Sequence, residues 1–121
     1  MDQLAGEDRG GGGRSSDGVS CDSQLVEVFH VLGKRWSGVI IATLLQRPVR
    51  FSELGNAIPG ISDSVLNARL RELIEVGLVE RQLAEGLATA VLYRLTAAGE
   101  DFRAAFDELR AWAVRNDGVP R

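Results

Sequence analysis

Apolar residues recur along this chain at two spacings, one typical of helices and one typical of strands. In several segments they recur every three or four residues, which places them on one face of a helix. This spacing predicts helices at 23–32, 35–46, 52–58, 63–76 and 97–115. Residues 78–84 and 90–95 are rich in Val, Leu and Tyr and flank a Gly-containing segment, which predicts two strands joined as a hairpin.

The segment from Pro59 to Gly77 carries a signal at each end of its predicted helix. Pro59 and Gly60 are turn residues. Ser62 can cap the helix, because its hydroxyl accepts hydrogen bonds from backbone amides of the first turn. Gly77 can take the left-handed conformation that ends many helices. We therefore expect a helix from about Asp63 to Val76.

At 3.6 residues per turn, this helix has one apolar and one polar face. The apolar face consists of Leu66, Leu70, Leu73 and, at its edge, Ile74. The opposite face consists of Ser64, Ala68, Arg71 and Glu75, with Asn67 beside it. Small and hydrogen-bonding side chains followed by a basic one suit a helix that enters a DNA groove. By itself, the pattern also fits an ordinary amphipathic surface helix.

The order of the elements narrows the fold. Residues 52–58, with Ser52 as the expected cap, are joined to the next helix by a tight turn, which predicts a helix-turn-helix. The hairpin that follows would be its wing. We therefore predict a mainly α (α+β) fold, a winged helix-turn-helix with a two-stranded wing and terminal dimerisation helices. Residues 1–18 are expected to be a disordered tail, 19–116 the folded domain and 117–121 a frayed end.

Charge and composition permit nucleic-acid binding and disfavour several other functions. The net charge is -3, but residues 33–82 carry seven basic and five acidic side chains, so this segment is mildly basic. A single Cys and a single His make a zinc site implausible. No nucleophile with a base and no phosphate loop is visible, so neither an enzyme nor a cofactor is expected. Without a long apolar run or a signal peptide, we expect a cytoplasmic protein.

Six short motifs resemble one known family. They are Gly33-Lys34-Arg35-Trp36, residues 48–54, residues 59–62, residues 70–73, residues 77–81 and residues 93–99. Over Cys21 to about Ala113 the chain resembles the HxlR-type transcriptional regulators, relatives of the MarR type. The resemblance implies a homodimeric bacterial DNA-binding regulator that dimerises through its terminal helices. We expect it to be a repressor located in the nucleoid. The uncharged hairpin tip at 86–90 departs from the family's polar or basic wing.

Each candidate residue has an expected role. Base reading is expected of Ser64 and Asn67, with Ala68 allowing close approach to a pseudo-palindromic double-stranded operator. The candidates for phosphate contacts are Arg50, Ser62, Arg71, Arg35 and Arg81, of which Arg71 could also read guanine. The candidates for dimerisation are Leu25, Phe102, Phe106, Leu109 and Trp112. Packing within the chain is the alternative for the aromatic residues, and a surface ion pair is the alternative reading of Arg69.

Cys21 stands just before the first predicted helix and has two interpretations. In the resembled family, a cysteine at this point often senses oxidants or electrophiles, so Cys21 is a candidate trigger that an inducer modifies. Alternatively, it is a small packing residue without reactivity. Two other functions stay open. One is regulation by a small apolar ligand held among Trp36, Phe51, Phe102 and Phe106, and the other is a protein-interaction module that does not bind DNA.

Overall fold

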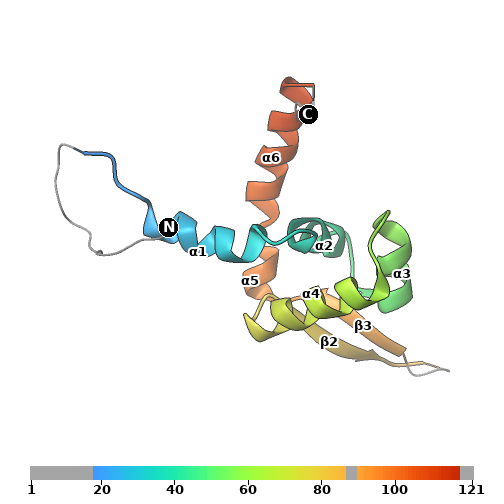
Figure 1. Ribbon diagram of the computed structural model, residues 1–121. Coiled ribbons are helices and arrows are strands. Elements are labelled where there is room, and N and C mark those ends of the chain that lie inside the picture. Colours follow the sequence, from blue (N-terminus) through green and yellow to red (C-terminus); the bar gives the residue numbers. More distant parts are fainter. Residues whose placement is uncertain (1–17, 87–89, 118–121) are drawn as a thin grey trace.

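The computed structural model describes residues 18–86 and 90–117 of the chain. The helices are α1 (Ser23–Leu32), α2 (Ser37–Leu44), α3 (Phe51–Ala57), α4 (Asp63–Glu75), α5 (Ala97–Glu100) and α6 (Arg103–Arg115). The strands are β1 (Val49–Arg50), β2 (Val79–Ala84) and β3 (Ala90–Leu95). Figure 1 shows a body built from α2 to α5 and the sheet, from which α1 and α6 project in different directions. None of the helices in these two ranges is long and apolar enough to cross a membrane.

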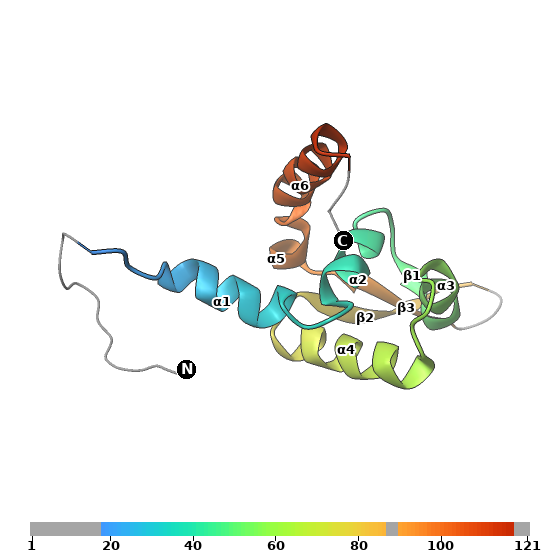
Figure 2. The same cartoon turned by 45° about the horizontal axis from the view of Figure 1, so that its top comes forward.

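The predicted winged helix-turn-helix is confirmed, and its wing belongs to a larger sheet than we expected. The three strands are antiparallel in the order β1-β3-β2, so β3 is central. Val49 pairs with Tyr93 and Arg50 with Leu92, which adds β1 to the hairpin. A strand of two residues is too short to show an alternating pattern, and its partner is distant in the sequence. In Figure 2, α4 lies along one side of the body next to β2.

The core lies between α2, α4 and the sheet. The helix α2 is apolar nearly all round, and its Ile40 and Ile41 have no exposed surface. From α4, Leu66, Leu70 and Leu73 point into the same cluster. The sheet contributes its own buried side chains, Val49, Val79, Tyr93 and Leu95. The predicted inner face of α4 is therefore the observed one. For α2, the spacing placed Trp36, Val39, Ile40 and Leu44 on one face, and this was wrong in part, because Val39 is 48% exposed and Ile41 is buried instead.

Three predicted helix boundaries were wrong. The helix α2 starts at Ser37 rather than Arg35, because Trp36 has a left-handed backbone with φ of 83°. The helix α3 starts at Phe51, so Ser52 lies inside it and Arg50 is the capping position. There, Glu53 Oε1 accepts from the Arg50 backbone N–H at 2.9 Å. The long last helix is two helices, because a turn at 101–102 separates α5 from α6.

The last helices are fastened to the body at three points. Thr96 caps α5: its Oγ1 accepts from the Gly99 N–H at 3.2 Å and donates to the Gly77 carbonyl at 2.6 Å. Arg103, the first residue of α6, donates to the Leu45 carbonyl at 2.8 Å. Gly99 itself is buried, and a Cβ there would stand 2.4 Å from the Leu78 carbonyl oxygen. Only glycine permits this close approach of α5 to the start of β2.

The predicted end segments remain predictions. Residues 1–17 of the expected tail, and 118–121 of the expected frayed end, lie outside the described residues. The same holds for the centre of the uncharged wing tip, residues 87–89.

Two glycine substitutions should change stability in opposite directions. Gly99→Ala forces Cβ against the Leu78 carbonyl and Leu95 and should lower the free energy of unfolding by about 1–3 kcal/mol. Gly38→Ala, on α2, meets nothing within 4 Å and should raise it by up to about 1 kcal/mol through helix propensity. Urea unfolding measures both. A Gly99→Ala protein as stable as the wild type would contradict the close packing of α5 described above.

Candidate nucleic-acid interface

The helix α4 is closed at both ends by the residues that its sequence predicts. At its start, Ser62 Oγ accepts from the Val65 N–H at 3.2 Å. At its end, Gly77 has φ of 84°, its N–H donates to the Ile74 carbonyl, and the Leu78 N–H donates to the Leu73 carbonyl at 2.9 Å. This pair of bonds satisfies carbonyls that the helix leaves without partners. Thus α4 has defined ends and leads directly into the wing.

The two faces of α4 are sharply divided. The side chains of Leu66, Leu70 and Leu73 are at most 1% exposed. On the other side, the exposed residues are Ser64, Asn67, Ala68, Arg71 and Glu75. The structure therefore brings all four α4 residues predicted to face DNA onto one solvent-facing surface, which we call the outer face of α4. Its hydroxyl, amide and guanidinium groups can hydrogen-bond base edges or phosphates, and Ala68 leaves room for close approach.

Three acidic side chains, Glu53, Glu72 and Glu80, are paired with basic ones. Glu53 lies 2.8 Å from Arg47, Glu80 lies 3.1 Å from Arg94, and Glu72 lies close to both Arg69 and Lys34. The hydrogen bond from Arg47, together with one from the Arg50 backbone, lowers the pKa of Glu53. The Glu53 carboxylate is thus paired with the Arg47 guanidinium.

The four predicted phosphate-binding arginines have no carboxylate partner among the described residues. Arg50 and Arg71 are exposed. The guanidinium of Arg35 lies 4.6 Å from the centre of the Trp36 ring, and that of Arg81 lies 5.9 Å from the Tyr93 ring. A guanidinium held on an aromatic face keeps its hydrogen-bond donors at the ring edge. All four can therefore still bind an anionic partner.

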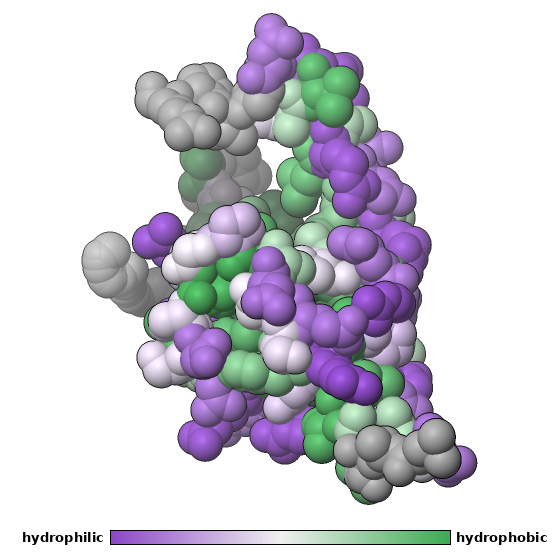
Figure 3. Space-filling model, turned by 90° about the vertical axis from the view of Figure 1, so that its right-hand side faces the viewer, coloured by the Kyte–Doolittle hydropathy of each residue, from purple (hydrophilic) through white to green (hydrophobic). Residues whose placement is uncertain are grey.

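The wing offers apolar rather than charged contacts near its tip. Leu83 of β2 pairs with Val91 of β3, and these side chains are 66% and 42% exposed. The lower right of Figure 3 shows the corresponding apolar region beside the wing loop. Arg81, two pairs further from the tip on β2, is the nearest described basic residue of that strand.

The predicted dimerisation residues fall into two groups. Phe106 is buried and its ring lies 5.5 Å from that of Phe102, so these two aromatic residues pack within the chain. By contrast, Leu25 on α1 and Leu109 and Trp112 on α6 are between 43% and 60% exposed. Phe29 on α1 is also 61% exposed. Among the described residues outside the wing, the largest exposed apolar side chains are therefore those of the two projecting helices.

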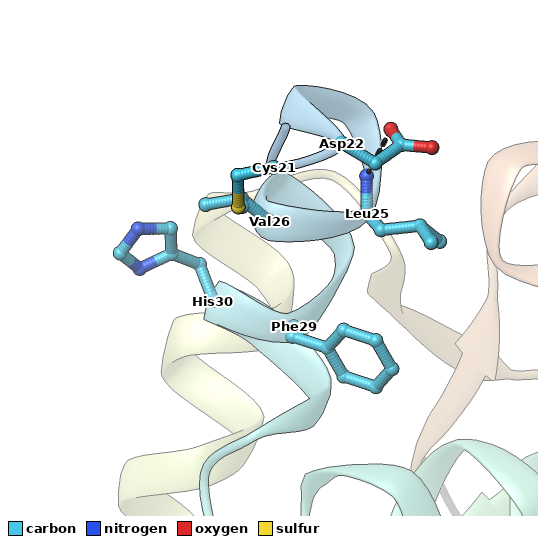
Figure 4. A pocket seen from close by; sticks show the side chains of 6 residues that line it. All are labelled: Cys21, Asp22, Leu25, Val26, Phe29 and His30. Atoms are coloured by element: carbon cyan, nitrogen blue, oxygen red, sulfur yellow. Dashed lines mark hydrogen bonds between the residues drawn. The ribbon is translucent and has the colours of Figure 1, made fainter. Parts of the chain in front are cut away.

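Cys21 is exposed at the start of α1. Its neighbour Asp22, not Ser23, caps this helix, because Oδ1 accepts from the N–H groups of Gln24 and Leu25. Those amides are therefore not free to interact with a thiolate at Cys21. Figure 4 shows Cys21, Val26 and His30 on one side of α1 and Leu25 and Phe29 on another. Together with Asp22, they line an open, largely apolar hollow of about 510 Å³.

The four aromatic residues proposed to hold an apolar ligand take part in separate packing contacts. Phe51 lies 6.5 Å from Tyr93, and Phe102 packs on Phe106. Trp36 lies under Arg35 and beside Gly60. The hollow along α1 has another set of walls, and sequence reasoning did not single out Val26 or Phe29 as its lining.

Sequence reasoning also understated the role of Arg69. The ion pair that it predicted is present, with 3.3 Å between Nη1 of Arg69 and Oε1 of Glu72. In addition, Arg69 Nε donates to the backbone carbonyl of Arg35 at 3.0 Å. No local pattern announces this second contact, because it joins α4 to the connection between α1 and α2.

The chain is similar to known transcriptional regulators over most of its length. Residues 31–118 match the HxlR-like helix-turn-helix family. The HTH-type transcriptional regulator YodB of Bacillus subtilis is 42% identical over 90 residues, which cover 74% of this chain and 80% of YodB. The reduced form of YodB has a TM-score of 0.69 and 40% identity, covering 78% of this chain and 92% of that one.

The quinone-bound form of the same B. subtilis protein has a TM-score of 0.67 and 39% identity, covering 78% of this chain and 99% of that one. This chain belongs to the HxlR-like helix-turn-helix family, and its curated relatives such as YodB are HTH-type transcriptional regulators. The family resemblance predicted from the motifs is thereby confirmed.

Proposed function

We propose that this chain is a dimeric repressor that reads a pseudo-palindromic operator through the outer face of α4. The exposed polar side of α4, set opposite its buried leucines, is the observation that carries the proposal. Ser64 and Asn67 contact base edges in the major groove, and an Asn amide suits the N6 and N7 atoms of adenine. Ala68 allows the helix backbone to approach the bases.

Phosphate contacts surround this reading surface. Arg71 lies one turn beyond Asn67 on α4 and binds the DNA backbone, while Ser62 approaches a phosphate from the start of the helix. Arg50, at the start of α3, binds the strand on the other side of the helix-turn-helix. Arg35 and Arg81 extend the contact. These roles are supported by the absence of carboxylate partners for the arginines within the described residues.

Dimerisation through α1 and α6 supplies the two-fold symmetry that a palindromic operator requires. The support is the exposure of Leu25, Phe29, Leu109 and Trp112 on two projecting helices. Pairing with a second copy would remove these side chains from water. Residues 19–116 would then form the DNA-binding and dimerisation unit.

Modification of Cys21 releases the operator. Cys21 is exposed, and the relative YodB has been solved bound to a quinone. A Cys21 thiol adds to a quinone ring carbon to form a C–S bond, and its proton moves to a quinone oxygen. Diamide would instead oxidise two thiols to a disulfide. Because each chain has one cysteine, that disulfide joins two subunits or a subunit and a small thiol.

The reading role of Asn67 is tested by comparing it with Arg71. Asn67→Ala should cost about 1–3 kcal/mol on the operator and leave binding to a scrambled sequence unchanged. Arg71→Ala should weaken both sequences alike and reduce the dependence of affinity on salt. Gel-shift titrations at several salt concentrations measure this. Equal affinity of Asn67→Ala and wild type for the operator would refute the reading role. A wild type without salt-dependent binding would favour a protein-interaction module.

Two variants test the dimer surface, each placing one negative charge on a different side of α6. Leu109→Glu should convert the dimer to a monomer, because burying an unpaired carboxylate in the interface is costly. Ala104→Glu is the matched control on the opposite side of the helix and should leave the dimer intact. Light scattering after gel filtration gives the masses. A dimeric Leu109→Glu protein would place the interface elsewhere.

The thiol trigger is tested by removing it. Wild-type protein should lose operator affinity on treatment with benzoquinone or diamide, whereas Cys21→Ser should keep it. Both proteins should bind equally before treatment, since Cys21 precedes α1, which projects from the body that carries α4 (Figure 1). If Cys21→Ser releases DNA as readily as the wild type, the trigger is a different group. Thermal-shift assays with aromatic compounds would then test for a ligand that does not react with thiols.

A further inference from the structure

The short connection between α1 and α2 is fastened to α4 by charged side chains. Arg69 of α4 donates through Nε to the carbonyl of Arg35 at 3.0 Å and lies 3.3 Å from Glu72 through Nη1. The other carboxylate oxygen of Glu72 lies 3.2 Å from Nζ of Lys34. We call these four residues, Lys34, Arg35, Arg69 and Glu72, the linker clamp. Through it, two residues of α4 hold two consecutive residues of the connection.

The next residue of the connection reaches the turn before α4. Trp36 has a left-handed backbone, which is rare for a bulky side chain and needs support from its surroundings. The Arg35 guanidinium covers its ring, and the ring packs against the core. Its Cη2 lies 3.6 Å from the position that a Cβ on Gly60 would take. The connection is thus held at α4 and also at the turn that leads into it.

The helix α1 depends on this connection for its position. None of its ten residues, all within the described range, is buried, and only Val31 and Leu32 at its end pack against the core. The rest of α1 projects from the body (Figure 1). A change in its direction therefore has to pass through residues 33–36.

We infer that the linker clamp couples the position of α1 to that of α4, so that a change at α1 alters the fit of α4 to DNA. The inference rests on the proposed function, and it supplies the route from Cys21 to the outer face of α4. Arg69 and Glu72 are positioning residues in this account. The Arg69 side chain is only 24% exposed, compared with 63% for Arg110 on α6, and its donors are directed at the connection.

A bulky methanethiosulfonate reagent tests the coupling without requiring a natural inducer. The Cys21 thiolate displaces the sulfinate of the reagent and forms a mixed disulfide, and the single cysteine ensures that the label is attached only at Cys21, just before α1. Hydrogen exchange of residues 63–75 is then measured in full-length protein without DNA. The variants are Arg69→Met, which removes the carbonyl contact and one ion pair, and Glu72→Gln, which removes both ion pairs.

Two control variants change the same groups away from the clamp. Glu75→Gln neutralises an exposed carboxylate on the same helix, and Arg110→Met removes the Asp107 ion pair on α6. Labelling should change the hydrogen-exchange rates of α4 by about threefold or more in the wild type and in both controls. In Arg69→Met and Glu72→Gln the change should fall to less than about half of that. Thermal melts of the unlabelled proteins check folding. If Arg69→Met does not fold, the response of Glu72→Gln alone tests the coupling.

Two results would overturn the inference. If labelling leaves α4 exchange in the wild type unchanged, α1 is not coupled to α4. If both clamp variants respond as strongly as the wild type, the coupling takes another route. A parallel operator titration separates this inference from the proposed function. Labelling should lower wild-type affinity about tenfold but lower that of the clamp variants by about twofold at most. If the hydrogen exchange of α4 responds to labelling as expected but the protein binds no operator, the proposed DNA-binding function is refuted and the coupling of α1 to α4 is not.

Discussion

Burial of Leu66, Leu70 and Leu73 fixes the rotation of α4 about its own axis. Each of these side chains contributes about 1.5–3 kcal/mol by leaving water, and they enter a core already formed by α2 and the sheet. Rotating α4 by one residue position would expose leucines and bring Asn67 or Arg71 toward that core, where unpaired polar groups are costly. The same packing that stabilises the fold therefore presents Ser64, Asn67 and Arg71 to solvent. The proposed reading surface follows from the core.

The rest of the structure places this helix relative to its neighbours. The bonds around Gly77 lead α4 into the wing, and Thr96 ties the end of β3 back to the same turn. Arg103 fastens α6 to the end of α2, while Arg69 and Glu72 fasten the connection after α1 to α4. The two projecting helices thus meet the body close to the elements that support α4. In a dimer built from α1 and α6, their positions would set the separation of the two outer faces.

Where signals are local, the sequence was sufficient. Ser62 and Gly77 lie next to the helix they bound, and the leucine spacing needs no knowledge of the partner helix, so α4 was predicted with its correct inner face. The strand β3 and the helix α1 were likewise predicted with their observed bounds. The strand β1 was missed because its only evidence is pairing with Tyr93 and Leu92, far along the chain. The break between α5 and α6 was missed because neither residue of the turn itself, Asp101 or Phe102, is Gly or Pro.

The candidate site likewise has parts that local sequence signals predict and parts that depend on the folded arrangement. Helix projection found the outer face of α4, because exposure there depends on periodicity alone. It could not find that Arg69 reaches the carbonyl of Arg35, nor that Trp36 adopts a left-handed backbone, since both depend on the folded arrangement of α1, α2 and α4. Phe102 and Phe106, which fitted a dimer stripe, pack on one another within the chain. The exposed part of that stripe is at Leu109 and Trp112.

The central claim is that the outer face of α4 is the surface that contacts DNA. Backbone amide NMR spectra of the protein titrated with its operator test this claim directly. The account predicts that the largest chemical-shift changes fall on residues 62–71 and on Arg50, with smaller changes on the wing strands. Chemical-shift changes concentrated on α1 and α6, with the amide signals of α4 unshifted, would contradict it.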